Sequence, residues 1–106
     1  MAITYLQNEG RVEAVLSVTS DGKLFNAIAE AIDEKFHVIW KDKLNGLDQR
    51  YWDFQLDECV FTLHLEHYLG ISLYPAFITP DINTANATIK ILGEYLDITM
   101  FSGENR

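Results

Sequence analysis

The side chains that could carry chemistry gather in one stretch of this chain. Asp53, Thr62 and His64 occupy alternate positions of two segments, and Tyr51 would lie opposite His64 if these segments paired as a hairpin. A carboxylate beside a histidine can act as a general acid–base pair. No nucleophile or obvious cleft accompanies them. We therefore expect an Asp53/His64 surface cluster whose main role is cross-strand polar pairing, with a small enzyme as the alternative.

A metal site or a reactive thiol would use Cys59, His64 and His67. Positions 64 and 67 of a strand point to opposite faces of a sheet. Their order along the chain also lacks the helical HExxH arrangement. Cys59 follows two acidic residues, which disfavour a reactive thiolate. We expect a buried structural thiol, no bound metal, no cofactor and no enzymatic activity.

The charge of the chain restricts its partners. The 106 residues include 16 acidic and 8 basic side chains, for a formal net charge of −8. This charge repels nucleic-acid phosphates and favours basic partners. The first residues lack a signal-peptide pattern, no stretch is long enough to span a membrane, and a single cysteine suits a reducing compartment. We expect a cytoplasmic protein that binds neither nucleic acid nor membrane.

The elements that would position these side chains follow from periodicity. Large apolar residues occupy every second position on both sides of the dipeptide Asp57-Glu58. A two-residue turn there would pair Phe54 with Phe61 and place every large apolar side chain on one face of the sheet. A slip of one residue would move them to the other face, so the alternation fixes the pairing.

The strand that follows must also place its large apolar residues on this face of the sheet. A three-residue turn or a bulge near Gly70 would pair Leu63 with Ile71 and Phe61 with Leu73. The apolar face of this sheet needs a cover, and two amphipathic helices are available for it.

The sequence thus predicts an α+β fold over residues 1–106. We expect an antiparallel β-meander sheet of about five to six strands, with two helices packed on one face. Thr79 should cap the second helix, with Pro80 at its first position. The tail, 102–106, should be frayed. The other expected segments are strands at 3–7, 11–19 and 37–40, a helix at 22–35 and a polar loop at 41–49.

The uncovered face would carry tyrosines among carboxylates. Exposed tyrosines are enriched in binding hot spots, and carboxylates attract basic partners. Trp40 and Trp52, in contrast, are assigned to the core. The candidate partner-binding residues are Asp48, Tyr51, Asp53, Asp57, Glu58, His64, Glu66 and Tyr68.

A resemblance adds a specific expectation. The aromatic–Asp–aromatic segment at 51–54, the apolar strand at 61–65 and the Tyr-Leu-Gly-Ile turn at 68–71 resemble small bacterial proteins. Some of those are similar to immunity proteins of contact-dependent growth inhibition and polymorphic toxin systems. The resemblance implies a cytoplasmic protein that binds and blocks a toxin made by the same cell or its kin. The negative charge of the chain predicts that this partner is a basic toxin domain. A structural or regulatory subunit that dimerises through its sheet edge remains a further alternative.

Overall fold

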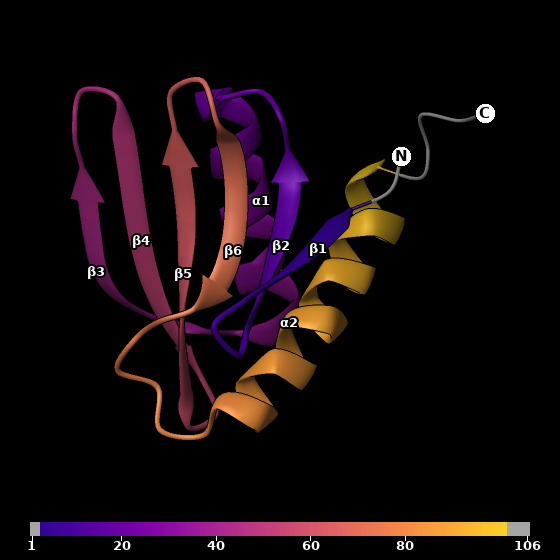
Figure 1. Cartoon of the computed structure of the whole chain (residues 1–106). Coiled ribbons are helices and arrows are strands. Elements are labelled where there is room, and N and C mark those ends of the chain that lie inside the picture. Colours follow the sequence, from indigo (N-terminus) through magenta and orange to yellow (C-terminus); the bar gives the residue numbers. More distant parts are fainter. Residues whose placement is uncertain (1–2, 102–106) are drawn as a thin grey trace.

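Six strands and two long helices make up the computed structural model, which describes residues 3–101 (Figure 1). The predicted α+β class is confirmed, while the predicted frayed tail lies outside the described residues. Within the described range, no helix is both long and apolar enough to cross a membrane. The elements are β1 (Thr4–Asn8), β2 (Arg11–Ser17), α1 (Gly22–Phe36), β3 (Ile39–Asn45), β4 (Gln49–Leu56), β5 (Cys59–Glu66), β6 (Gly70–Pro75), α2 (Ile82–Leu96) and the π-helical turn η1 (Asp97–Phe101).

The strands form one antiparallel sheet in the order β1-β2-β6-β5-β4-β3. Strands β3 to β6 form a meander of four consecutive strands, whereas the prediction extended the meander over the whole sheet of about five to six strands. The β1–β2 hairpin joins this meander through a pairing of β2 with β6. Helix α1 passes behind the sheet and carries the chain from β2 to the far edge, where β3 lies (Figure 1).

One face of the sheet is buried against both helices. Every second side chain of the strands points toward this face and packs against the apolar stripes of α1 and α2. The apolar residues of each stripe recur every three or four positions along the helix. Burying one such side chain fully is worth about 1.5–3 kcal/mol relative to leaving it exposed. The face opposite the helices is called the open face below. The largest fully buried side chains are Phe25, Phe54, Phe61, Leu16, Ile28, Ile32, Leu63, Ile71, Leu73, Ile89, Leu92 and Leu96.

The β4–β5 register agrees with the prediction. Phe54 pairs with Phe61, and the turn occupies the two residues Asp57 and Glu58. Asp57 adopts a left-handed φ of 56°, a conformation that Asp tolerates better than most residues. The alternation therefore places the apolar residues of this hairpin on the helix-covered face.

The predicted β5–β6 register is wrong by two residues. Leu63 pairs with Leu73 and not with Ile71, although the parity of the faces is preserved. The three-residue loop lies at positions 67–69, because positive φ angles at Tyr68 (75°) and Gly70 (101°) close the turn there. Gly70 is thus the first residue of β6.

The polar loop predicted at 41–49 is also wrong. Strand β3 begins at Ile39 and continues to Asn45, with a register shift between Trp40 and Lys43. Because β3 pairs only with β4 and lies at the edge of the sheet, most of its side chains are exposed. Because a single half-buried side chain of this strand, Trp40, packs against the core, no apolar alternation marks it, and charged side chains are common on edge strands.

The start of the second helix differs from the prediction. Asp81 caps α2, and its Oδ1 accepts a hydrogen bond from Thr84 N at 3.2 Å. The hydroxyl of Thr79 instead accepts a hydrogen bond from Val60 N at 2.9 Å. Thr79 therefore links the β6–α2 connection to β5 by a hydrogen bond. Pro80 lies before the helix and is not its first residue.

Candidate functional site

Three rings from neighbouring strands form a row across the open face. Tyr51 of β4 stacks on His64 of β5, with ring centroids 4.3 Å apart and an interplanar angle of 17°. The two residues are register partners, as predicted. The hydroxyl of Tyr74, from β6, lies 3.3 Å from His64 Nδ1. All three side chains are half-buried, so each is held by its neighbours and still offers surface to a partner.

Two carboxylates flank this ring row. Asp53 Oδ1 accepts a hydrogen bond of 2.7 Å from the Thr62 hydroxyl. Glu66 Oε1 lies 3.2 Å from His64 Nε2, an ion-pair distance without a well-formed hydrogen bond. The carboxylate beside His64 is therefore that of Glu66. The Asp53/His64 pair expected for the alternative enzyme is not brought into direct contact.

Burial controls the protonation of His64 and Tyr74. Burial lowers the pKa of His64 from its ordinary value, and the nearby carboxylates of Glu66 and Glu13 oppose this effect only in part. Burial also raises the pKa of Tyr74 to about 12, helped by the negative charges around it. At neutral pH both rings are uncharged. Negative charge on the open face therefore comes from the carboxylates, while the rings supply neutral contact area.

Acidification should destabilise the fold through His64. Its lowered pKa means that the unfolded chain binds the proton first as the pH falls below about 6.5. The stability contributed by neutral His64 is present above that pH and is lost as the pH falls through the lowered pKa. We expect the midpoint of urea unfolding to fall between pH 7.5 and 5.5.

His64→Gln is the matched variant for this measurement. It removes the titrating ring but leaves the exposed residues His37 and His67 in place. Its unfolding midpoint should depend less on pH over the same range. A wild-type midpoint that stays constant, or an equal fall in both proteins, would show that His64 is not held neutral by burial.

The remaining candidate residues lie at the two ends of the strands. Asp57 and Glu58 form the exposed β4–β5 turn at one end. Asp48 and Tyr68 lie at the other end, where His67 N donates a 2.9 Å hydrogen bond to Asp48 O. Tyr68 is 87% exposed. The structure thus gathers four of the eight predicted residues on the open face and separates the other four into two end pairs.

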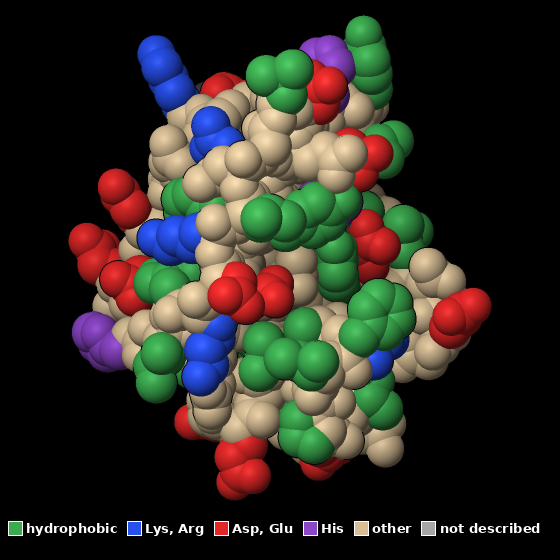
Figure 2. Space-filling model, turned by 90° about the vertical axis from the view of Figure 1, so that its left-hand side faces the viewer, with side chains coloured by type: hydrophobic (Ala, Val, Ile, Leu, Met, Phe, Trp, Pro, Cys, Tyr) green, Lys and Arg blue, Asp and Glu red, His purple; other side chains and the backbone are tan. Residues whose placement is uncertain are grey.

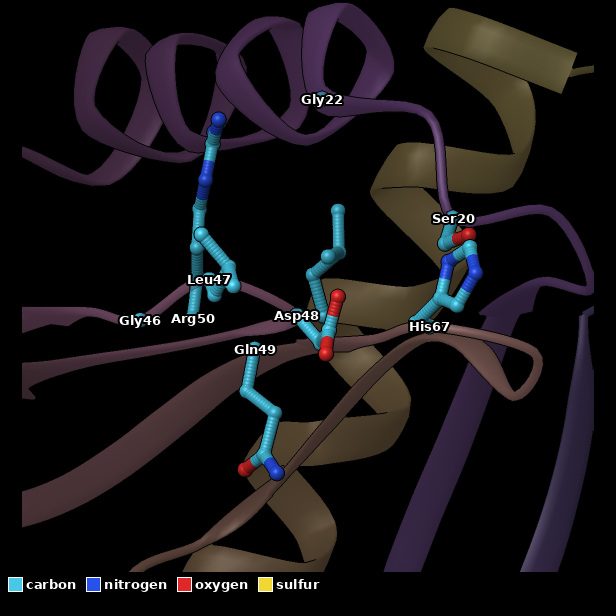
Figure 3. Close-up of a pocket in the computed structure, with 9 residues that line it drawn as sticks. Ser20, Gly22, Gly46, Leu47, Asp48, Gln49, Arg50 and His67 are labelled. Carbon is cyan, nitrogen blue, oxygen red and sulfur yellow. The ribbon is translucent and has the colours of Figure 1, made fainter.

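A hollow of about 190 Å³ opens beside Asp48, between the strand ends and the first residue of α1, Gly22 (Figure 3). Arg50 points from β4 toward the helix in this view. Its guanidinium donates to Asn26 Oδ1 at 3.3 Å and lies 5.5 Å from the centre of the Phe25 ring. Since this cation is already engaged and the Asp48 carboxylate borders the hollow, the arrangement does not favour a bound phosphate.

Strand β2 extends the open face in a way that the sequence did not predict. Glu13, Arg11 and Tyr74 line a second hollow, of about 320 Å³, which also reaches His64. Arg11 Nη1 donates to Pro75 O at 3.1 Å and so holds β2 against the end of β6. Local patterns could not reveal the role of Glu13, because it depends on the long-range pairing of β2 with β6.

Comparison of the chain with protein-family models, with curated proteins and with solved structures found no match. Within residues 3–101, no three His, Cys, Asp or Glu side chains are grouped so that they could hold a metal ion. Cys59 is a buried free thiol, as predicted. Function is therefore inferred from the geometry of the open face.

Proposed function

We propose that the chain is an immunity protein, which neutralises a cognate toxin by binding its basic surface through the open face. The observation that carries this proposal is the row of Tyr51, His64 and Tyr74, flanked by the carboxylates of Asp53 and Glu66. The same function is expected from the resemblance of the segments at 51–54 and 61–71 to small bacterial proteins, some of which are similar to immunity proteins.

The ring row suits binding because its side chains are already ordered. Tyr51 is stacked on His64 before any partner arrives, so little rotamer entropy is lost on association. Tyrosine is also enriched among residues that dominate binding energy. Inhibition by such a surface requires shape and charge, and no bond has to be made or broken by this chain.

The negative charge suits a basic partner. A net charge of −8 favours rapid encounter with a basic surface, and this effect weakens as salt screens the charges. Toxins that attack nucleic acids present basic clefts, since their substrates are anionic. A sheet face with its loops can supply the roughly 800 Å² per partner that a stable complex requires.

Removal of charge from the open face should slow association. In the double variant Asp53→Asn and Glu66→Gln, each side chain keeps its shape, and the amide oxygen introduced at position 53 can still accept from Thr62. We expect association to slow about tenfold at low salt, with a weaker dependence on ionic strength. Stopped-flow or surface-plasmon measurements would use the purified product of a toxin-like reading frame immediately upstream of this gene.

The matched control changes net charge equally on the helices. Glu34→Gln with Glu94→Gln removes two exposed carboxylates from α1 and α2. Association of this control should change less than twofold. Equal slowing in both double variants would contradict the open face as the interface. The absence of a toxin-like neighbouring frame, or failure of its product to bind, would contradict the immunity function.

A further inference from the structure

A second surface with specific chemistry lies on the flank between α1 and the edge strand β3. A hollow of about 370 Å³ is bordered there by Trp40 and Trp52. Their rings meet edge to face, with centroids 5.8 Å apart at 82°. Figure 2, which faces the β3 side of the molecule, shows hydrophobic, basic and acidic side chains close together on this flank. The two indoles therefore form an aromatic corner open to solvent.

The aromatic corner already holds a cation of the chain itself. Lys43 Nζ lies 4.4 Å from the centre of the Trp52 ring and 5.1 Å from that of Trp40. Both distances are within the range of cation–π attraction, which is strongest over tryptophan. A single ammonium group thus contacts both indoles, which shows that the corner has the right geometry for a positive charge.

Helix α1 adds carboxylates to the other side of the hollow. Asn26, Glu30 and Asp33 follow one another at spacings of four and three, so they form one ridge along the helix. Both acidic side chains are exposed, and among the described residues neither lies within ion-pair distance of a basic group. The hollow thus combines an aromatic wall with two carboxylates that are available to a cationic ligand.

The indoles are held in place by the core beneath them. Trp52 Nε1 donates a 2.8 Å hydrogen bond to Asn45 Oδ1, and the buried Phe25 ring meets the Trp52 ring edge to face at 4.9 Å. Trp40 packs similarly on Phe54, at 5.3 Å. Because these contacts fix the ring planes, a ligand would meet a preorganised wall and would need to displace only Lys43.

We propose that this flank binds an arginine side chain of a basic partner protein, and that Lys43 occupies the site until the arginine displaces it. A guanidinium is planar, stacks on aromatic rings and donates several hydrogen bonds to carboxylates. It can therefore use the aromatic wall and the α1 ridge together, which a compact ammonium does less well. The site shares no residue with the open face and does not rest on the immunity function.

N-acetyl-arginine N-methylamide is a suitable probe for this site. The side-chain N–H resonances of Trp40 and Trp52 would be followed by NMR while the compound is added to the full chain. We expect saturable shifts with a dissociation constant on the order of 1 mM or weaker. In Lys43→Ala the tethered competitor is gone, so binding should tighten roughly three- to tenfold. Lys43 is exposed, so this change should not affect folding.

Two comparisons distinguish a site that recognises a guanidinium group from a surface that binds cations nonspecifically. In the Lys43→Ala background, Glu30→Gln with Asp33→Asn should weaken probe binding at least threefold, whereas Glu34→Gln on the same helix should leave it unchanged. Tetramethylammonium, which cannot donate hydrogen bonds, should bind at least threefold more weakly than the arginine compound. No saturable shift in Lys43→Ala, equal loss with Glu34→Gln, or equal binding of tetramethylammonium would overturn the proposal.

Discussion

Replacing Gly70 with alanine should destabilise the chain by about 3 kcal/mol or more. Gly70 has a φ of +101°, which L side chains adopt only at a cost of about 1–3 kcal/mol. A Cβ at this position would also collide with Ser17 O and would lie 2.9 Å from Val18 Cα. These are backbone atoms and cannot swing away, so the turn or the end of β2 must shift. Urea unfolding followed by circular dichroism would measure the loss.

Gly10→Ala is the matched control for this substitution. Gly10 has a φ of +82°, but an added Cβ would meet nothing within 4 Å. Only the backbone strain applies there, at about 1–2 kcal/mol. The difference between the two variants therefore measures the close approach of Gly70 to the end of β2. If both variants lost the same stability, the placement of β2 beside β6 would be wrong.

The position of β2 beside β6 is a feature of the fold that the sequence could not predict. The β4–β5 hairpin was predictable because its turn has two residues and its apolar side chains alternate on both sides. The pairing of β2 with β6 joins segments that are far apart in the chain. No local pattern selects this neighbour, so the strand order was not predictable from periodicity alone.

The two wrong elements of the sheet have separate physical causes. In the β5–β6 hairpin, alternation fixes only the parity of the pairing, and a shift of two residues preserves it. The positive φ at Tyr68 and Gly70 decides between the allowed registers. Strand β3 lacks alternation because it is an edge strand with mostly exposed side chains, so its sequence resembles that of a polar loop.

The same distinction applies to the candidate sites. Tyr51 and His64 belong to one hairpin, and their contact followed from its register. The contact of Tyr74 with His64, in contrast, required the true β5–β6 turn. Both tryptophans were predicted from the sequence to lie in the core. They are partly buried and pack against the core, and their rings also meet the Lys43 ammonium group at the surface.

Phe54→Ala and Tyr51→Ala should differ in the stability they cost, because the two side chains lie on opposite faces of β4. Phe54 is 0% exposed and lies 5.5 Å from the Phe61 ring on the helix-covered side. Truncation of a buried phenylalanine costs about 3–5 kcal/mol, because transfer energy is lost and a cavity remains. This is a large part of the roughly 5–15 kcal/mol that stabilises a typical domain. Thermal and urea unfolding should both show the loss.

Tyr51→Ala should cost only about 1 kcal/mol, since it removes one stacked pair from a half-buried surface. Its larger effect should be on the proposed complex, where loss of a tyrosine hot spot would weaken binding about thirtyfold or more. The two residues are three positions apart on one strand, so alternation alone assigns them opposite roles. If Tyr51→Ala proved more destabilising than Phe54→Ala, the faces of the sheet would be inverted, and the ring row would be part of the core instead of a surface for a partner.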